Sequence, residues 1–345
     1  MMQEAASNRP NQFRARVRFL LGFILGVGLL TGLAESYLRL FPPRDLCPFL
    51  GDASPLRGLY KADADFGISY RSWDAFRQDN DERMAAFQSF EASSTAPPVW
   101  VFFGNSFVQA PGMLADHARH AVHERRIFNL GRNEPLPIRL AQIRLLLEHG
   151  LEPERIFIAV MPVDMIALGE QPLATYQVTA NGALTYRPRR PAGPLGWLIG
   201  RSRLPLTAWV RTGQQRGNPR FQAGKLYEGV EEPLLGDLRL LFGNLARLAR
   251  AHQVPITILL IPAYHQIRYG ASCGFQDTLG RLFHEQGFDV FDPRDAFRQQ
   301  PDLDALFIPD RHFAPLGNQI LLSELLRHLR SQESLTRANA EARRP

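Results

Sequence analysis

The sequence predicts an α/β fold, a three-layer α/β/α domain built on a mostly parallel sheet. Short apolar runs without alternation recur along the chain, which is typical of strands that are buried on both faces of a parallel sheet. Between these runs, leucines recur with helical spacing, and strands that alternate with helices favour this architecture. The chain has 345 residues, which is enough for one large domain with appendages.

The N-terminus has the pattern of a membrane anchor. Arg9, Arg14, Arg16 and Arg18 precede residues 19–34, which carry no charge, and apolar character continues to Phe41. About 20 apolar residues span a bilayer, and basic residues stay on the cytoplasmic side. We therefore expect a cytoplasmic tail at 1–18, a transmembrane anchor at 19–41, and the remainder on the periplasmic side of the cytoplasmic membrane. A cleaved signal peptide also fits, because Gly32-Leu33-Ala34 has the small-x-small pattern of a cleavage site.

The segment at 42–97 contains Pro42-Pro43, a few glycines, scattered acids and Ser93-Ser94-Thr95, and we expect an irregular lead-in that packs along the domain. The domain itself is expected at 98–330. Its predicted strands are Val99–Phe103, Arg126–Asn129, Ile156–Met161, Ile256–Ile261 and Phe288–Phe291. Its predicted helices carry apolar stripes at Leu140/Ile143/Leu147, Leu238/Leu241/Leu245/Leu248, Leu279/Leu282/Phe283 and Leu321/Leu325/Leu329.

Two segments depart from this alternation. Residues 168–233 contain several prolines and predict an insertion beside the site, with a short helix near Leu206 to Arg211. For residues 331–345 we expect a polar tail.

Composition excludes some classes of function. The net charge is +6, but the arginines are spread along the chain among acids, whereas nucleic-acid binders gather charge on one face. Cys47 and Cys273 are the two cysteines, which excludes a disulfide framework and a cysteine zinc site. In an oxidising compartment these two could pair, or they are separate buried thiols.

Two short segments carry candidate catalytic residues. Ser106 follows the first strand of the domain through Gly104-Asn105, and Asp310-Arg311-His312 precedes the last helix. Ligands bind at the carboxyl ends of parallel strands. A serine nucleophile needs a base, and the base needs an orienting acid. The order of Ser106, Asp310 and His312 therefore fits a triad built from opposite ends of the fold. His265, after the strand at 256–261, is a weaker candidate base, since no acid accompanies it in its loop.

The segments GNSF and PDRHFAPLGN, separated by this alternation, resemble the SGNH/GDSL hydrolase superfamily. The segment IPAYHQI and the anchor ending in AESYLRLF also look like those of exported members. The resemblance implies a flavodoxin-like sheet, Ser106 as nucleophile, His312 as general base and Asp310 as its orienting acid. It implies no metal and no organic cofactor. An acid two residues before the histidine looks like the alginate-type polysaccharide O-acetyltransferases.

Two family blocks are altered in this chain. The family's second block ends in a glycine that donates to the oxyanion, and Glu134 stands there, while Gly131 is retained. In the third block, Val163 stands where an asparagine would donate. Losing one donor costs roughly 100- to 1000-fold in rate. The candidates for oxyanion or supporting roles are Asn105, Gly131, Asn133 and Asp164, and Asp164 equally fits a helix cap.

We therefore expect an exported serine-dependent O-acyl ester hydrolase or acyltransferase that acts on a cell-surface or secreted polysaccharide. Trp197 and Trp209 in the insertion could stack on a sugar. The alternative is a catalytically inactive SGNH-like scaffold or binding subunit, with envelope proteins as partners.

Overall fold

The computed structural model describes residues 9–40, 60–63, 65–70, 72–80, 97–132, 136–165, 174–178, 184–188, 225–230 and 232–342. Several predictions fall on other positions. The helix near 206–211 and the residues Cys47, Asn133, Trp197 and Trp209 lie outside the described residues.

Five parallel strands form the central sheet. They are β3 (Val99–Phe103), β4 (Arg126–Asn129), β5 (Arg155–Val160), β8 (Ile256–Leu260) and β9 (Asp289–Phe291). Their spatial order is β4-β3-β5-β8-β9, which is the 2-1-3-4-5 order of flavodoxin-like sheets. The predicted α/β fold class is thus confirmed, and each predicted strand is found to within a residue.

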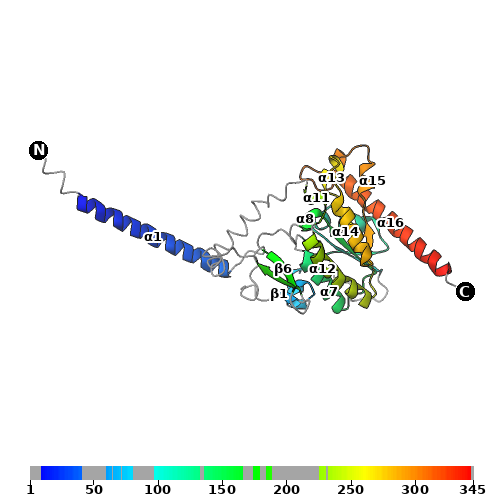
Figure 1. Cartoon of the computed structure of the whole chain (residues 1–345), viewed down its shortest axis with the longest axis horizontal. Coiled ribbons are helices and arrows are strands. Elements are labelled where there is room, and N and C mark those ends of the chain that lie inside the picture. The colour runs from blue at the N-terminus through cyan, green and yellow to red at the C-terminus, as the bar shows by residue number, and fades with distance from the viewer. Residues whose placement is uncertain are drawn as a thin grey trace.

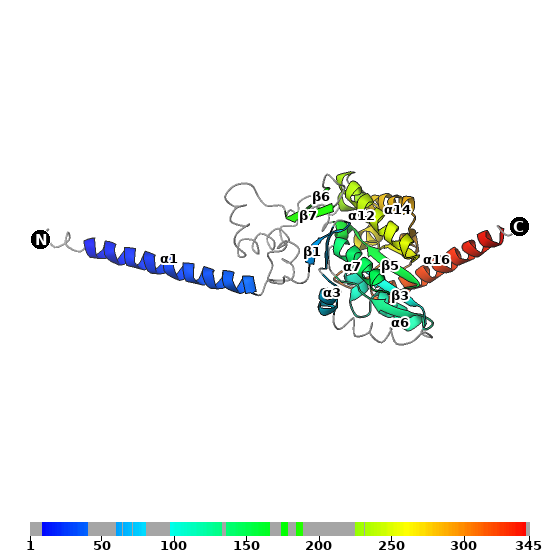
Figure 2. The same cartoon turned by 90° about the horizontal axis from the view of Figure 1, so that it is seen from below.

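Side chains of the strands alternate between two apolar cores. Val99, Val101 and Phe103 point into one core, whereas Trp100 and Phe102 point into the other. The first core is covered by α7 (Leu136–Glu148), α12 (Glu232–Ala251) and α14 (Gly274–Glu285). The second is covered by α6 (Leu114–Ala121), α15 (Arg294–Arg298) and α16 (Pro315–Ala342). Figure 2 shows α7, α12 and α14 on one side of β3 and β5, and α6 and α16 on the other. Burial of the sheet on both faces explains why its strands lack alternation in sequence.

The lead-in is more regular than its composition predicts. It contains an antiparallel hairpin, β1 (Tyr60–Asp63) and β2 (Gly67–Tyr70), followed by α3 (Trp73–Asp79). Phe66, Tyr70 and Phe76 are buried in the first core. The expectation of an irregular segment is therefore wrong for this part of 42–97, because three buried aromatic rings hold the hairpin and helix on the domain.

The insertion and the C-terminal tail also contain regular structure. Within 168–233, β6 (Ala174–Val178) and β7 (Leu184–Pro188) form an antiparallel pair, and α11 spans Lys225–Glu228. The predicted polar tail at 331–345 is not a separate segment, because α16 continues through it to Ala342.

The N-terminal helix α1 spans Arg9–Leu40 and lies away from the sheet domain in both views (Figures 1 and 2). Among the described residues it is the helix whose length and composition would allow it to cross a membrane. Its window Leu21–Leu38 has a mean hydropathy of 1.6, and none of its residues is buried. A signal sequence has the same properties.

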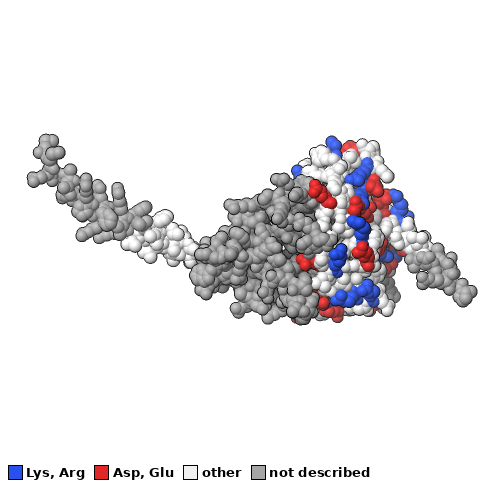
Figure 3. All heavy atoms as spheres, viewed as in Figure 1, with Lys and Arg blue, Asp and Glu red and all other residues white. Residues whose placement is uncertain are grey.

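Charges interleave on the described surface that Figure 3 shows. Basic and acidic side chains alternate there over short distances, as the scatter of arginines along the sequence predicts.

An ionic cluster lies at the amino ends of the strands and joins α16 to the sheet. The Asp289 carboxylate lies 2.7 Å from His328 Nε2 of α16, and it accepts hydrogen bonds from Thr257 (2.7 Å) and Arg155 (3.3 Å). Burial alone would raise the pKa of Asp289, but the hydrogen bonds from His328 and Thr257 and the charges of His328 and Arg155 outweigh burial, so its pKa is lowered.

We predict that Asp289→Asn lowers the free energy of unfolding by about 1–2 kcal/mol near pH 6, because hydrogen bonds to a charged group are lost. A carboxylate with a depressed pKa stabilises the fold above its unfolded pKa and loses this effect as pH falls through its folded pKa. The difference between wild type and variant should therefore shrink from pH 6 towards pH 3 in urea unfolding. Asp295→Asn, at an exposed position of α15, is the control. A difference that is constant with pH would contradict the assignment.

Candidate active site

The site lies at the carboxyl ends of β3 and β5, where the order of the strands reverses direction and open α/β sheets bind ligands. Gly104 directly follows β3 and allows the chain to turn into the short helix α5 (Ser106–Gln109). A Cβ on Gly104 would lie 2.6 Å from Val108 Cγ2 and 2.9 Å from Ala159 Cβ. Only glycine lets α5 pack this closely on the sheet, and this packing sets the position of Ser106.

His312 meets Ser106 from the far end of the domain. Its Nε2 lies 2.7 Å from Ser106 Oγ, across 206 positions of sequence. The imidazole packs on the Phe107 ring, with centroids 4.6 Å apart, and the next residue, Phe313, is buried in the second core. The histidine loop is closed by a hydrogen bond of 2.9 Å from the Ile308 N–H to the His312 carbonyl. The predicted pair is therefore brought within hydrogen-bond distance by packing on both sides.

Asp310 lies beside the other nitrogen of the ring. Its Oδ1 accepts the backbone N–H of His312 at 3.1 Å and lies 3.0 Å from His312 Nδ1. Nδ1 has no hydrogen-bond partner among the described residues, so we describe this second contact as electrostatic. The hydrogen bond from the His312 backbone, followed by the contact with its side chain, lowers the pKa of Asp310. The Asp310 side chain is 64% exposed, so solvent screens part of its electrostatic interaction with His312.

Ser106, His312 and Asp310 therefore have the order of a nucleophile, a base and an orienting acid. The serine hydroxyl can give its proton to Nε2 while Nδ1 faces a carboxylate, which is the arrangement required for attack on an acyl carbonyl.

A buried polar network lies beneath the serine. Asn105 Oδ1 accepts the Phe107 N–H at 3.1 Å, and Asn105 Nδ2 lies 3.5 Å from Asp164 Oδ2. Asp164 also accepts the Met161 N–H at 2.8 Å and forms an ion pair with Arg139. Asn105, Asp164 and Arg139 are each at most 5% exposed. Asp164, the third residue of α8 (Pro162–Met165), thus accepts the N–H of the residue before that helix and also supports the serine turn. Asn105 has both of its polar ends directed at protein groups.

The amides near the predicted oxyanion site are partly engaged by the protein. The Gly131 N–H donates to Asn129 Oδ1 at 2.9 Å, and the Arg132 N–H donates to the Gly104 carbonyl at 2.6 Å. A Cβ on Gly131 would lie 2.9 Å from the Gln109 backbone nitrogen, so glycine is required there for packing against α5.

His265 does not approach Ser106 as a base would. It lies on α13 (Tyr264–Arg268), and its Nε2 is 3.0 Å from Arg311 Nη1. The ring faces a cation instead of an acid.

Sequence reasoning missed Arg139 and Arg311. Arg139 had only a weak signal, since the mostly apolar stretch 136–147 in which it is buried also contains Gln142 and Arg144. Arg311 had none beyond its position between the two candidate residues Asp310 and His312.

The contact between Asn105 and Asp164 predicts that a charge at position 105 destabilises the fold. Asn105→Asp would place a second carboxylate beside Asp164 in a buried site with Arg139 as the shared cation. We expect a loss of about 2 kcal/mol in the free energy of unfolding, because a buried charge without its own partner is costly. The double variant Asn105→Asp/Asp164→Asn should recover most of this loss in thermal unfolding. If the double variant is no more stable than the single one, the two side chains are not coupled.

Comparisons with known proteins find similarity in structure only. No protein-family model matches the chain, and no curated protein matches it. TesA has 13% identity and a TM-score of 0.40, covering 67% of this chain and 97% of its own length. A lipase/acylhydrolase from Enterococcus faecalis has 12% identity and a TM-score of 0.38, covering 68% and 96%. Axe2, an acetyl-xylooligosaccharide esterase from Geobacillus, has 13% identity and a TM-score of 0.37, covering 68% and 94%. These structural neighbours are SGNH/GDSL hydrolases. At these identities and TM-scores, the function of this chain has to be inferred from its own side chains.

Proposed function

We propose that this protein is a serine-dependent O-acyl ester hydrolase or acyltransferase of the SGNH type. The observation that carries the proposal is the distance of 2.7 Å between Ser106 Oγ and His312 Nε2, at the carboxyl edge of a 2-1-3-4-5 parallel sheet. A serine at a strand-to-helix turn, in contact with an imidazole that faces a carboxylate, is the arrangement of acyl-transfer enzymes.

In the proposed mechanism, Ser106 Oγ attacks the acyl carbonyl and its proton passes to His312 Nε2. Asp310, kept ionised by its lowered pKa, stabilises the imidazolium that forms. The tetrahedral intermediate then collapses, the ester C–O bond breaks, and Nε2 returns the proton to the departing alcohol. The acyl group on Ser106 is transferred to water in a hydrolase or to a sugar hydroxyl in a transferase. In both cases His312 removes the proton of the acceptor, the bond between the acyl group and Ser106 Oγ breaks, and His312 returns the proton to Oγ.

The proposed substrate is an O-acylated cell-surface or secreted polysaccharide, and the proposed location is the periplasmic side of the cytoplasmic membrane. Four arginines precede the exposed apolar window of α1, which supports an anchor with the domain outside. The acid two residues before His312 supports a polysaccharide substrate through its resemblance to the alginate-type O-acetyltransferases.

A second candidate is a catalytically inactive scaffold or binding subunit of an envelope assembly. The engagement of the Gly131 and Arg132 amides within the protein supports it, since amides around Gly131 are candidates to replace the oxyanion donors that this chain lacks. Both candidates share the fold and the anchor, and they differ in whether Ser106 is acylated.

The full-length protein should hydrolyse p-nitrophenyl acetate, and Ser106→Ala and His312→Ala should each lower kcat/KM by at least about 1000-fold. Both variants remove a group that reacts directly, so kcat should account for most of the loss. Asp310→Asn should cost less, about 10- to 100-fold, because the carboxylate is largely exposed and its contact is screened by water.

Ser323→Ala and His284→Ala, exposed on α16 and α14, are the matched controls and should retain wild-type rates. Adding acetylated and free oligosaccharides and measuring acetyl transfer by mass spectrometry separates transferase from hydrolase. Equal rates in wild type, Ser106→Ala and His312→Ala would eliminate the proposed mechanism.

A further inference from the structure

Arg311 lies between Asp310 and His312 in an unusual backbone conformation. Its φ is +73°, in the left-handed region, which costs a residue with a Cβ about 1 kcal/mol. Glycine or asparagine would adopt this conformation at lower cost. An arginine nevertheless occupies this position, which points to a role for its side chain.

The guanidinium of Arg311 is held in place by α13. Nη1 lies 3.0 Å from His265 Nε2, and the guanidinium carbon lies 5.9 Å above the Tyr264 ring. Tyr227, a buried residue of α11, has its ring 6.3 Å from that of His265. Burial and the Arg311 charge lower the pKa of His265, so the imidazole is neutral near pH 7 and can accept a hydrogen bond from Arg311.

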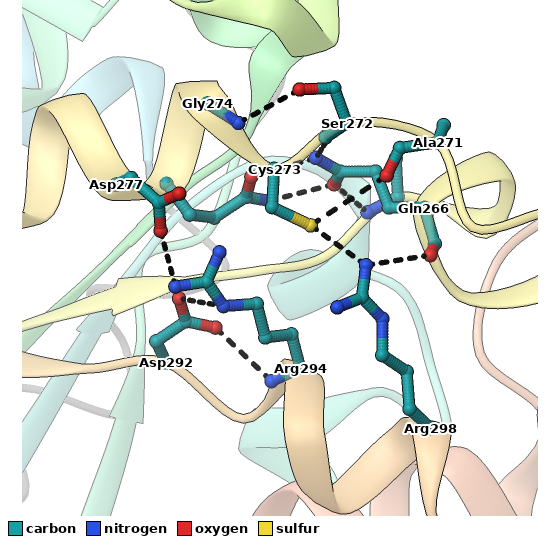
Figure 4. A network of polar contacts seen from close by, with 11 residues as sticks. Gln266, Ala271, Ser272, Cys273, Gly274, Asp277, Asp292, Arg294 and Arg298 are labelled. Atoms are coloured by element: carbon teal, nitrogen blue, oxygen red, sulfur yellow. Dashed lines mark hydrogen bonds and ion pairs between the residues drawn. The ribbon is translucent and has the colours of Figure 1, made fainter.

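Helix α13, which contacts Arg311, is held in place by hydrogen bonds to α14 and α15. Buried Gln266 of α13 exchanges hydrogen bonds of 2.7 Å with Gln276 of α14. Arg298 of α15 donates to the Gln266 carbonyl at 3.3 Å and lies 3.0 Å from Cys273 Sγ. Figure 4 shows Arg298 pointing at both groups, and Arg294 reaching Asp277 and Asp292 beside them. His265 and Tyr264 therefore stand on a rigid support.

The Arg311 charge is not neutralised by the part of the chain that the structure describes, where no carboxylate forms an ion pair with it. The contrast is Arg268, also on α13, whose guanidinium lies 5.6 Å above the Tyr269 ring but is paired with Asp304 at 2.6 Å. Arg311 is exposed, positively charged and oriented, which suits a group that receives an anion.

The mechanism determines which part of a substrate would meet Arg311. His312 Nε2 must return a proton to the departing alcohol, so the alcohol portion of the ester lies over His312. Arg311 is the neighbouring residue on the same loop. We propose that Arg311 binds an anionic group, such as a carboxylate, on the alcohol portion of the ester substrate. This proposal rests on the proposed esterase chemistry and makes Arg311 a specificity-determining residue.

The first test compares 4-acetoxybenzoate with its neutral counterpart, methyl 4-acetoxybenzoate, using the full-length protein. The measured quantity is the ratio of kcat/KM for the anionic ester to kcat/KM for the neutral ester. Arg311→Gln should lower this ratio about tenfold, chiefly through the KM of the anionic ester, because a charge-assisted contact is lost. Arg311→Lys should recover part of the ratio, and Arg268→Gln should leave it unchanged. An unchanged ratio in Arg311→Gln would overturn the proposal even if both esters are hydrolysed.

The second test needs no turnover. Isothermal titration of 4-acetoxybenzoate into full-length Ser106→Ala should show tighter binding than for the methyl ester. Ser106→Ala/Arg311→Gln should lose this preference. If wild type hydrolyses neither ester but the binding preference follows Arg311, the anion site stands and the esterase proposal fails. If Ser106→Ala binds both compounds equally, the anion site is refuted.

Discussion

Ser106 and His312 lie 206 positions apart in sequence, one after the first strand of the domain and the other before its last helix. The site requires them to stay at hydrogen-bond distance, and 2.7 Å separates Oγ from Nε2. Aromatic packing maintains this distance. The Phe107 ring supports the imidazole on one side, and Phe313, buried against Phe297 and Phe307, fixes the loop that carries it. The second core, beneath α6, α15 and α16, is therefore as necessary to the site as the polar residues themselves. Dense packing transmits small shifts, so a substitution that leaves a cavity under Phe313 would displace His312.

The two ends of the sheet have different polar chemistry. At the amino ends, Asp289, His328 and Arg155 form an ionic cluster that binds α16 to the strands. At the carboxyl ends, the buried ion pair of Arg139 and Asp164 supports Asn105 in the serine turn. A buried ion pair adds little net stability but is costly to break, which suits a group whose role is to fix a geometry. Asp310 and Arg311 are exposed at the same end of the sheet as this buried network, where a substrate can reach them.

Much of the fold follows from local sequence pattern. The five strands are apolar runs because both faces of the sheet are covered, and the four predicted helical stripes match the helices that cover it. The meeting of Ser106 with His312 was predictable from the chemistry, because a serine nucleophile needs a base and His312 lies in the loop before a helix that packs on the sheet. The hairpin at 60–70 was not predictable, since its strands are four residues long and its stability comes from tertiary burial of Phe66 and Tyr70. The partners of Arg139 and Arg311 were also hidden, because each contact joins distant segments, as between Arg139 and Asp164 or between Arg311 and His265. The roles of Asn105 and Gly131 became clear only once the acceptors of their hydrogen bonds were known.

The central claim is that the Ser106 hydroxyl is activated by His312. The most direct test is intact mass and peptide mapping of the full-length protein after treatment with a serine-reactive fluorophosphonate. We expect one adduct, mapped to Ser106, that is absent from Ser106→Ala and forms much more slowly in His312→Ala. A folded wild-type protein that forms no adduct, or forms it at another residue, would contradict the account and favour the scaffold role.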